Sequence, residues 1–132
     1  MKITLFAAMF GALLVSAACA AADPASDAKR LVNELIDATN GRNAAKFGDL
    51  ITADAMFGIN DVGFPLSIDG LATFTKECQL GGVSDAKAED LDGTSMLVVN
   101  TQWRCPKGDK QTQVLKIQFM VIGQKIVGSY AS

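Results

Sequence analysis

The sequence contains no histidine among its 132 residues. Histidine is the most common general base near neutral pH and the most common zinc ligand, so its absence excludes the usual sites of both kinds. Cysteine is scarce, with three residues, and there are only one tryptophan, one tyrosine and three prolines. No glycine-rich phosphate loop or nucleotide motif is present. We therefore expect no metal site and no cofactor.

An excess of basic charge is also lacking. The chain has 12 lysines and arginines against 14 acidic residues, and its net charge is −2. Proteins that bind nucleic acid or anionic membranes usually carry a basic patch, so we expect neither partner. The hydrophobic fraction of 49% and the charged fraction of 20% are those of an ordinary globular protein, and the length fits one domain.

The one long stretch without charge lies at the N-terminus, between Lys2 and Asp23. It begins with the apolar run Ile3–Val15 and continues with small residues up to Ala22. This order is typical of a secretory signal peptide, here residues 1–20, with cleavage after Ala20 or Ala22. We therefore expect a periplasmic or secreted protein.

Two alternatives for this N-terminal segment stay open. It could be retained as a membrane anchor, although Ile3–Val15 is short for a bilayer span of about 20 residues. It could also be a lipoprotein signal in which Cys19 is acylated, although the position three residues earlier is Ser16, where such sites usually have leucine. With cleavage, the mature chain has no stable membrane span.

Cys78 and Cys105 are the two cysteines that remain after cleavage. In an oxidising compartment, an isolated pair of cysteines is most simply a disulfide. It would close a loop of about 28 residues and stabilise the fold by about 3.5 kcal/mol. The alternative is two separate buried thiols.

The first part of the mature chain has helical periodicity. Asp23-Pro24 is typical of a helix start, and Gly41 of a helix end. Between them, apolar residues recur at three- and four-residue spacing: Ala28, Leu31, Val32, Leu35 and Ile36. A shorter second helix is expected to turn Phe47, Leu50 and Ile51 inward. A third is expected to be capped by Asp69 and to end at Gly81-Gly82.

The second part has a period of two. A strand is expected over residues 95–105, a hairpin turn over 106–110, a return strand over 111–122 and a last strand over 125–131. A further strand at 83–90 is weakly patterned, and another starts near Asp54-Ala55. Helices first and an antiparallel sheet afterwards predict an α+β fold, with three N-terminal helices packed on a curved, mostly antiparallel sheet.

Three segments resemble the NTF2-like superfamily, which includes ketosteroid isomerases and SnoaL-like cyclases. They are LVNELIDATNGRNAAKFGDLITADAMF, IDGLATFTKE and FMVIGQKIVGSYAS. The first is similar to the family's two helices and its first strand, the second to its Gly-led third helix and the last to its closing hairpin. The resemblance spans residues 24–131 and implies a single domain with a cone-shaped, NTF2-like or cystatin-like architecture. Because this fold hosts unrelated functions, it does not by itself imply an activity.

The isomerase branch of this family uses a tyrosine on the first helix, an aspartate at the end of the first strand and an acid in the penultimate strand. Aligned without gaps, the first two positions fall on Leu35 and Ile59, and residues 113–121 contain no acid. The three catalytic roles are therefore vacant. Asp61 is the one candidate substitute, if a bulge turned it inward; the alternative is that Asn60-Asp61 is simply a turn.

An apolar cone without catalytic groups could still bind a ligand. The candidate pocket residues are Leu35, Phe57, Ile59, Trp103, Phe119 and Tyr130. For Trp103 and Tyr130 the alternative is ordinary core packing.

Three functions follow as hypotheses. The favoured one is an exported, non-catalytic module that binds a small apolar molecule or a protein partner. The second is a SnoaL-like or isomerase-type enzyme with a rearranged acid-base site around Asp61. The third is a homodimer formed through the sheet, because apolar residues also occupy its predicted outward positions: Met96, Val98, Val114 and Met120.

Overall fold

The computed structural model describes residues 23–132. The predicted signal peptide and Cys19 lie outside the described residues. The first described helix, α2 (Pro24–Asn40), begins and ends where the sequence predicts. Asp23 caps it by accepting from the Ala25 amide, and Gly41 follows its last turn. The Ser26 hydroxyl donates to Asp23 at 2.7 Å, and this hydrogen bond lowers the pKa of the Asp23 carboxyl.

Two shorter helices follow, α3 (Ala44–Leu50) and α4 (Ile68–Thr75). The cap of α4 is Ser67, whose hydroxyl accepts from the Gly70 amide at 3.0 Å, and not Asp69 as the sequence suggested. Asp69 lies in the first turn instead and pairs with Arg42 at 2.8 Å. The helix also ends earlier than predicted, and Gly81-Gly82 belong to the strand that follows.

The strands form one sheet in the order β2-β1-β7-β6-β5-β3, and β4 pairs with the other half of β5. Every pairing is antiparallel except that of β1 with β7. The strands are β1 (Ile51–Ile59), β2 (Val62–Pro65), β3 (Gln79–Val83), β4 (Lys87–Leu91), β5 (Thr94–Pro106), β6 (Thr112–Ile122) and β7 (Lys125–Ala131).

Two strand boundaries differ from the sequence prediction. Ile51 is the first residue of β1 and does not belong to the second helix. The weak pattern at residues 83–90 belongs to two short strands, β3 and β4, separated by residues 84–86. β3 also contains a register shift between Leu80 and Gly82, which disturbs the alternation that a sequence pattern relies on.

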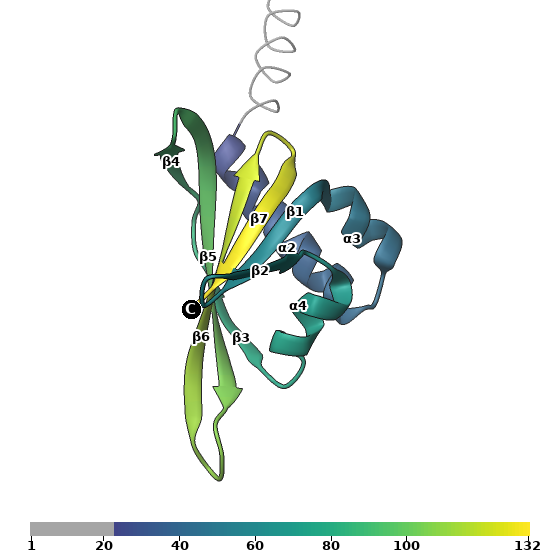
Figure 1. Cartoon of the computed structure of the whole chain (residues 1–132), viewed down its shortest axis with the longest axis vertical. Coiled ribbons are helices and arrows are strands. Elements are labelled where there is room, and N and C mark those ends of the chain that lie inside the picture. The colour runs from purple at the N-terminus through teal and green to yellow at the C-terminus, as the bar shows by residue number, and fades with distance from the viewer. Residues whose placement is uncertain (1–22) are drawn as a thin grey trace, which may run out of the picture.

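The helices of residues 23–132 lie on one face of the curved sheet and do not cover its other face (Figure 1). The predicted α+β architecture of three helices on a curved, mostly antiparallel sheet is therefore confirmed. We call the face under the helices the inner face and the opposite one the outer face. The largest fully buried side chains come from α2, α4 and the inner face: Leu35, Leu71, Phe57, Phe119, Ile117 and Ile126.

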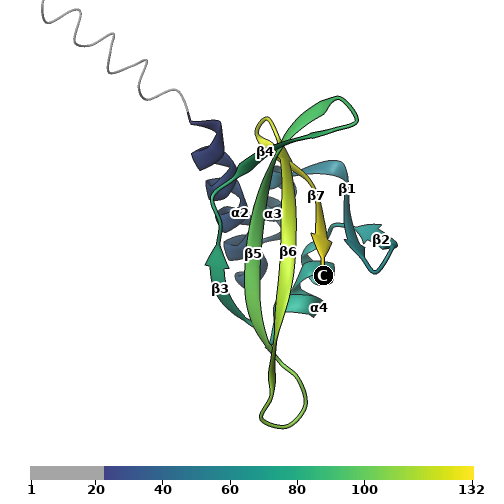
Figure 2. The same cartoon turned by 90° about the vertical axis from the view of Figure 1, so that its left-hand side faces the viewer.

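The long strand β5 gives the molecule its length. At one end it forms a hairpin with β4, and at the other it forms a hairpin with β6 that extends beyond the helices (Figures 1 and 2). Among residues 23–132, no helix is long and apolar enough to cross a membrane.

Candidate functional site

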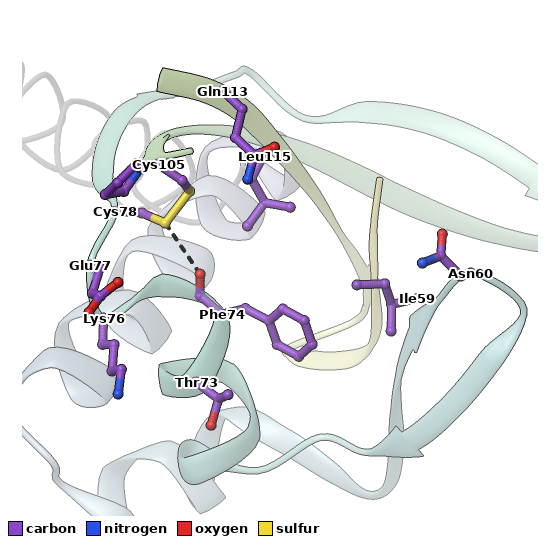
Figure 3. A pocket seen from close by; sticks show the side chains of 11 residues that line it. Ile59, Asn60, Thr73, Phe74, Lys76, Glu77, Cys78, Cys105, Gln113 and Leu115 are labelled. Carbon is purple, nitrogen blue, oxygen red and sulfur yellow. Dashed lines mark hydrogen bonds between the residues drawn. A yellow bond between two sulfur atoms is a disulfide. The ribbon is translucent and has the colours of Figure 1, made fainter. Parts of the chain in front are cut away.

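A cleft of about 500 Å³ opens between α4 and the ends of β1, β5 and β6. Its volume falls within the range of small-molecule sites. Figure 3 shows Phe74, Leu115 and Ile59 pointing toward one another across the cleft, while Lys76 extends away from them.

The floor of the cleft is apolar and its rim is polar. Phe74 packs on the core residue Phe57 with ring centroids 5.1 Å apart, so it is held in place from below while it faces the cleft. Polar side chains from α4, the segment after it, β6 and the β1–β2 turn complete the lining: Asn60, Thr73, Lys76, Glu77 and Gln113. A carboxylate and an ammonium group, Glu77 and Lys76, thus both lie at the exposed rim.

One wall of the cleft is the disulfide between Cys78 and Cys105, which confirms the predicted pairing. It joins the segment after α4 to the end of β5. The Sγ atom of Cys78 also lies 3.3 Å from the carbonyl oxygen of Phe74. The disulfide therefore holds the end of α4, and with it the floor residue Phe74, at a set distance from the sheet.

The interior of the cone is filled by its own side chains. Four of the predicted pocket residues, Leu35, Phe57, Trp103 and Phe119, are buried in this core and do not line the cleft. The Trp103 ring nitrogen donates to the Thr101 hydroxyl at 2.8 Å, which in turn donates to the Ile117 carbonyl, so this polar pair is internally satisfied. Of the predicted pocket residues, Ile59 is the one that reaches the cleft.

Asp61 lies in the tight turn between β1 and β2. Ile59 pairs with Val62, so Asn60 and Asp61 are the two residues of the loop, and their φ angles are 49° and 65°. Two consecutive positive φ values are those of a type I′ hairpin turn, in which Asn and Asp are favoured. Asp61 is exposed and does not line the cleft, so the arrangement matches the turn interpretation.

The outer face carries an unusual number of apolar side chains. One row across the sheet runs through Met56, Gly128, Met120 and Val98, which are register partners on β1, β7, β6 and β5. The next row contains Tyr130, which is 40% exposed and covers Gly58. The predicted pocket residue Tyr130 therefore lies on the opposite side of the sheet from the cleft.

All three methionines of residues 23–132 lie on this outer face, since Met96 precedes the inward Leu97 on β5. Met56 is 47% exposed, Ile122 is 39% exposed, and Met96 and Met120 are partly buried. Figure 2 shows that no helix of the described residues lies over β5 and β6 on this side. We call Met56, Met96, Met120, Ile122 and Tyr130, with Val98 beneath them, the outer apolar patch.

Sequence reasoning did not single out Phe74, Leu115 and Gln113 as pocket residues. Phe74 and Leu115 were identified as inward-facing, but nothing in the pattern indicates that β6 and α4 diverge at this end and leave their side chains accessible. No group of three or more acidic or cysteine side chains able to hold a metal ion occurs within residues 23–132. The cleft and the outer apolar patch are thus two places where the described chain presents apolar side chains to solvent in a group.

Comparison with known proteins gives similarity in structure alone. No protein-family model matches the chain, and no curated protein matches it. Among solved structures, the S. rosetta CaMKII hub superposes with a TM-score of 0.59 at 12% identity, over 84% of this chain and 97% of the hub chain. A candidate ketosteroid isomerase from Shewanella frigidimarina gives a TM-score of 0.53 at 12% identity, over 78% of this chain and 92% of the other.

A de novo designed NTF2 fold protein, NT-9, gives a TM-score of 0.50 at 14% identity, over 82% of this chain and 85% of the design. These similarities show that the chain has an NTF2-like fold, as its resemblance to that superfamily predicts. The similar proteins include a hub and a candidate isomerase, so the fold leaves the function open.

Proposed function

We propose that this protein is an exported, non-catalytic binding module whose copies associate in pairs through the outer apolar patch. The observation that carries the proposal is the row Met56–Gly128–Met120–Val98, which places the apolar side chains of Met56, Met120 and Val98 on three strands, with Gly128 of β7 between the two methionines, on a face that no helix of residues 23–132 covers. A sheet face that is meant for water normally alternates to polar side chains. Exposed apolar groups of this kind mark interaction surfaces.

The filled interior supports a binding role over a catalytic one. The two isomerase positions that could be assigned in the sequence are Leu35, which is fully buried against the core, and Ile59, which lies in the cleft with an aliphatic side chain. Proton transfer next to a substrate carbonyl needs a carboxylate base and a hydrogen-bond donor that face one site. The side chains at these positions are aliphatic, and Asp61 occupies a turn.

Replacing Met56 by glutamate tests the association. Desolvating a carboxylate in an apolar interface is costly, so we expect the wild type to be a dimer at about 10 µM and the variant to be a monomer, with at least a hundredfold weaker association. Sedimentation equilibrium measures both masses, and circular dichroism checks that the variant stays folded.

The matched control is Phe64→Glu. Phe64 has almost the same exposure as Met56, 48% against 47%, but it lies on the edge strand β2 with its side chain on the inner-face side. A monomeric wild type at every concentration tested would contradict the proposal.

The cleft suggests a second binding function, the uptake of a small apolar molecule against Phe74, Leu115 and Ile59. Its support is the combination of an apolar floor, a polar rim and a volume of about 500 Å³. Native mass spectrometry of protein purified from its own cell envelope would detect a retained ligand and would report the subunit count in the same spectrum.

The dye 1-anilinonaphthalene-8-sulfonate serves as a probe for this cleft. We expect wild-type protein to enhance its fluorescence and Leu115→Asp to weaken binding about tenfold or more, because the aspartate places a carboxylate on the cleft floor that must be desolvated and that repels the dye's sulfonate. The control is Val114→Asp, one residue earlier on β6 and 61% exposed on the outer face. Equal titration curves for Leu115→Asp and the wild type would exclude the cleft as the binding site.

A further inference from the structure

Strand β6 extends further than β7, the strand that pairs with it on one side. The β6–β7 ladder ends with Ala131 opposite Ile117 and one further rung, in which the backbones of Ser132 and Lys116 exchange hydrogen bonds of 2.8 and 3.1 Å. From there β6 continues to Thr112 with β5 as its one partner strand among the described residues. Figure 2 shows the β5–β6 hairpin running on past the end of β7. We call the strand position beside this last part of β6, in line with β7, the open lane.

The backbone of β6 presents free hydrogen-bonding groups to the open lane. Backbone groups along an antiparallel strand point alternately to its two sides, and those of Lys116 point toward β7. The groups of Val114 and Thr112 therefore point to the same side, into the open lane. The Lys107 amide donates to the Gln111 carbonyl at 2.8 Å, so the odd-numbered positions are the ones that pair with β5. Unpaired groups of this kind on a sheet edge are a template for an added strand.

The open lane lies at the mouth of the cleft. Ala131, the last residue of β7, is the register partner of Ile59 on β1 and of Ile117 on β6, so the lane continues between the ends of those two strands. Ile59 and Leu115 line the cleft from its two sides and point toward Phe74 (Figure 3). In a strand added to β6, the side chain opposite Leu115 shares its face of the sheet, so it would point into the cleft.

The outer face of the sheet beside the open lane carries positive charge. Arg104 pairs with the outer-facing Val114, and Lys116 lies two residues further along β6, so both basic side chains lie on the outer face. A side chain in the lane opposite Val114 would be a diagonal neighbour of Lys116, and diagonal neighbours are within reach of long side chains. The other outer-face positions at this end of β3, β5 and β6 are uncharged: Gln79, Gln102, Pro106 and Thr112.

The hairpin loop adds to this charge. Lys107 and Lys110 flank its one acidic residue, Asp109, so residues 104–116 have four basic side chains against one acidic side chain and a net charge of +3. All four basic side chains are exposed, and no salt bridge within residues 23–132 involves them. The whole chain has a net charge of −2, so its positive charge is concentrated at this hairpin.

The positive charge decides which kind of strand fits the open lane. Charged side chains beside a free edge commonly prevent association between edges. Two copies of this hairpin would repel each other in this way, so a second copy is disfavoured as the occupant. A strand with acidic side chains is attracted instead, and complementary charge selects it over other strands. Lys76 and Glu77 on the cleft rim offset each other, so acidic side chains are favoured on the outer side and apolar ones on the cleft side.

Resting on the proposed role of the cleft as a binding site, we infer that the open lane receives an extended acidic segment of a partner protein, which adds to β6 as an antiparallel strand. Its residues alternate: acidic side chains lie on the outer face near Lys116, and apolar side chains enter the cleft against Leu115 and Phe74. Backbone hydrogen bonds to Val114 and Thr112 supply affinity, and the two rows of side chains supply specificity.

Short synthetic peptides test the alternation. The probe is acetyl-Asp-Val-Asp-Val-Asp-Val-amide, and isothermal titration calorimetry measures its binding to the purified protein. We expect saturable binding with a dissociation constant below about 1 mM. Exchanging the three aspartates for lysines should weaken binding about tenfold or more, because like charges then meet on the outer face. The isomer acetyl-Asp-Asp-Asp-Val-Val-Val-amide has the same charge but cannot alternate, and it should lose about as much. Equal affinity of either control and the probe would overturn the inference.

Backbone methylation separates strand addition from simple uptake of the valine side chains. In the antiparallel arrangement, the residue opposite Val114 has its side chain on the outer face and its N–H toward β6, so the aspartate amides donate to the edge. N-methylation of two aspartates should therefore weaken binding about tenfold or more, whereas N-methylation of two valines should change it less than about threefold. Equal losses for the two methylated peptides would contradict strand addition.

A proline at Val114 tests the same backbone contact from the protein side. Val114→Pro removes an N–H that points into the open lane and that no strand of residues 23–132 uses, and proline is tolerated at such edge positions. We expect it to weaken probe binding about fivefold or more, whereas Val114→Ala keeps the N–H and should bind like the wild type. Circular dichroism checks the folding of both variants. If Val114→Pro does not fold, the methylated peptides decide the backbone contact.

Charge exchange at Lys116 tests the acidic row. Lys116→Glu should weaken binding of the aspartate probe about tenfold and should strengthen binding of the lysine peptide. The matched control is Lys87→Glu, the same change at an exposed outer-face position on the distant strand β4, and it should alter neither affinity. An unchanged preference of Lys116→Glu for the aspartate probe would show that the acidic row does not lie on this face.

The outcomes distinguish this inference from the proposals on which the protein's function rests. A cleft that binds the dye but none of the peptides overturns strand addition and leaves the cleft as a small-molecule site. Absence of both dye and peptide binding overturns the cleft together with the inference. The Met56→Glu variant should bind the probe like the wild type, so a failure of the outer-face association leaves strand addition standing.

Discussion

Replacing Phe119 by alanine is expected to lower the free energy of unfolding by about 3–5 kcal/mol. Phe119 lies on β6 and is fully buried, and its register partners Val99 and Ser129 are buried on either side of it. Removing the ring takes apolar surface out of the core and leaves a cavity that rigid sheet neighbours cannot close. A domain of this size is stabilised by about 5–15 kcal/mol in total, so this loss is a substantial share of its stability.

Urea unfolding followed by circular dichroism measures this loss. Val114→Ala is the matched control, since Val114 lies on the same strand but is 61% exposed on the outer face, and its loss should stay below about 0.5 kcal/mol. The result bears on function, because a large loss requires that the cone interior is filled by its own side chains. A loss below about 1 kcal/mol for Phe119→Ala would instead indicate a loosely filled, ligand-sized interior.

Removal of the disulfide by the double substitution Cys78→Ser and Cys105→Ser is expected to cost about 3–4 kcal/mol. The bond joins residues separated by 27 positions, and in the chain-entropy treatment a closed loop of this length restricts the unfolded state by that amount. Removal of the disulfide also affects the cleft, because the bond holds the end of α4 against β5 at the cleft wall.

Chemical unfolding with and without dithiothreitol checks this expectation. The reductant should destabilise the wild type to about the level of the double variant, and it should leave the double variant unchanged. Phe74 lies beside the bridge, so dye binding in the cleft should weaken in the double variant even in buffer where it is fully folded. An equal midpoint for wild type and variant would show that the bridge contributes nothing to the unfolding equilibrium.

The sequence determined the architecture through periodicity. The three- and four-residue spacing of Leu31, Val32, Leu35 and Ile36 is read directly as the buried stripe of α2. The strict alternation along β5 and β6 assigns Val99, Ile117 and Phe119 to the inner face, because successive strand side chains point to opposite faces. Counting two cysteines in the predicted mature chain was enough to predict their pairing.

The alternation fails where a strand contains an extra residue. Val121 pairs with Ile126 on the inner face and Met120 pairs with Gly128 on the outer face, so Val127 is an added residue in β7. If Val127 took its own place in a regular ladder, Tyr130 would share the inner face with Ile126, as the period of two predicts. The bulge reverses the alternation and turns Tyr130 onto the outer face.

The positions of the cleft and the outer apolar patch depend on tertiary structure, because each combines segments that are far apart in the sequence. The cleft joins residues from α4, β1, β5 and β6, and its existence depends on how far α4 lies from the sheet at one end. The outer patch depends on the parallel pairing of β1 with β7, which places Met56 in line with Met120 although 63 positions of chain lie between them, roughly half its length. Local periodicity determines which face of an element is apolar, because it depends on neighbours in the chain. Which apolar faces meet, and which remain exposed for a partner, depends on contacts between distant segments, and those exist only in the folded molecule.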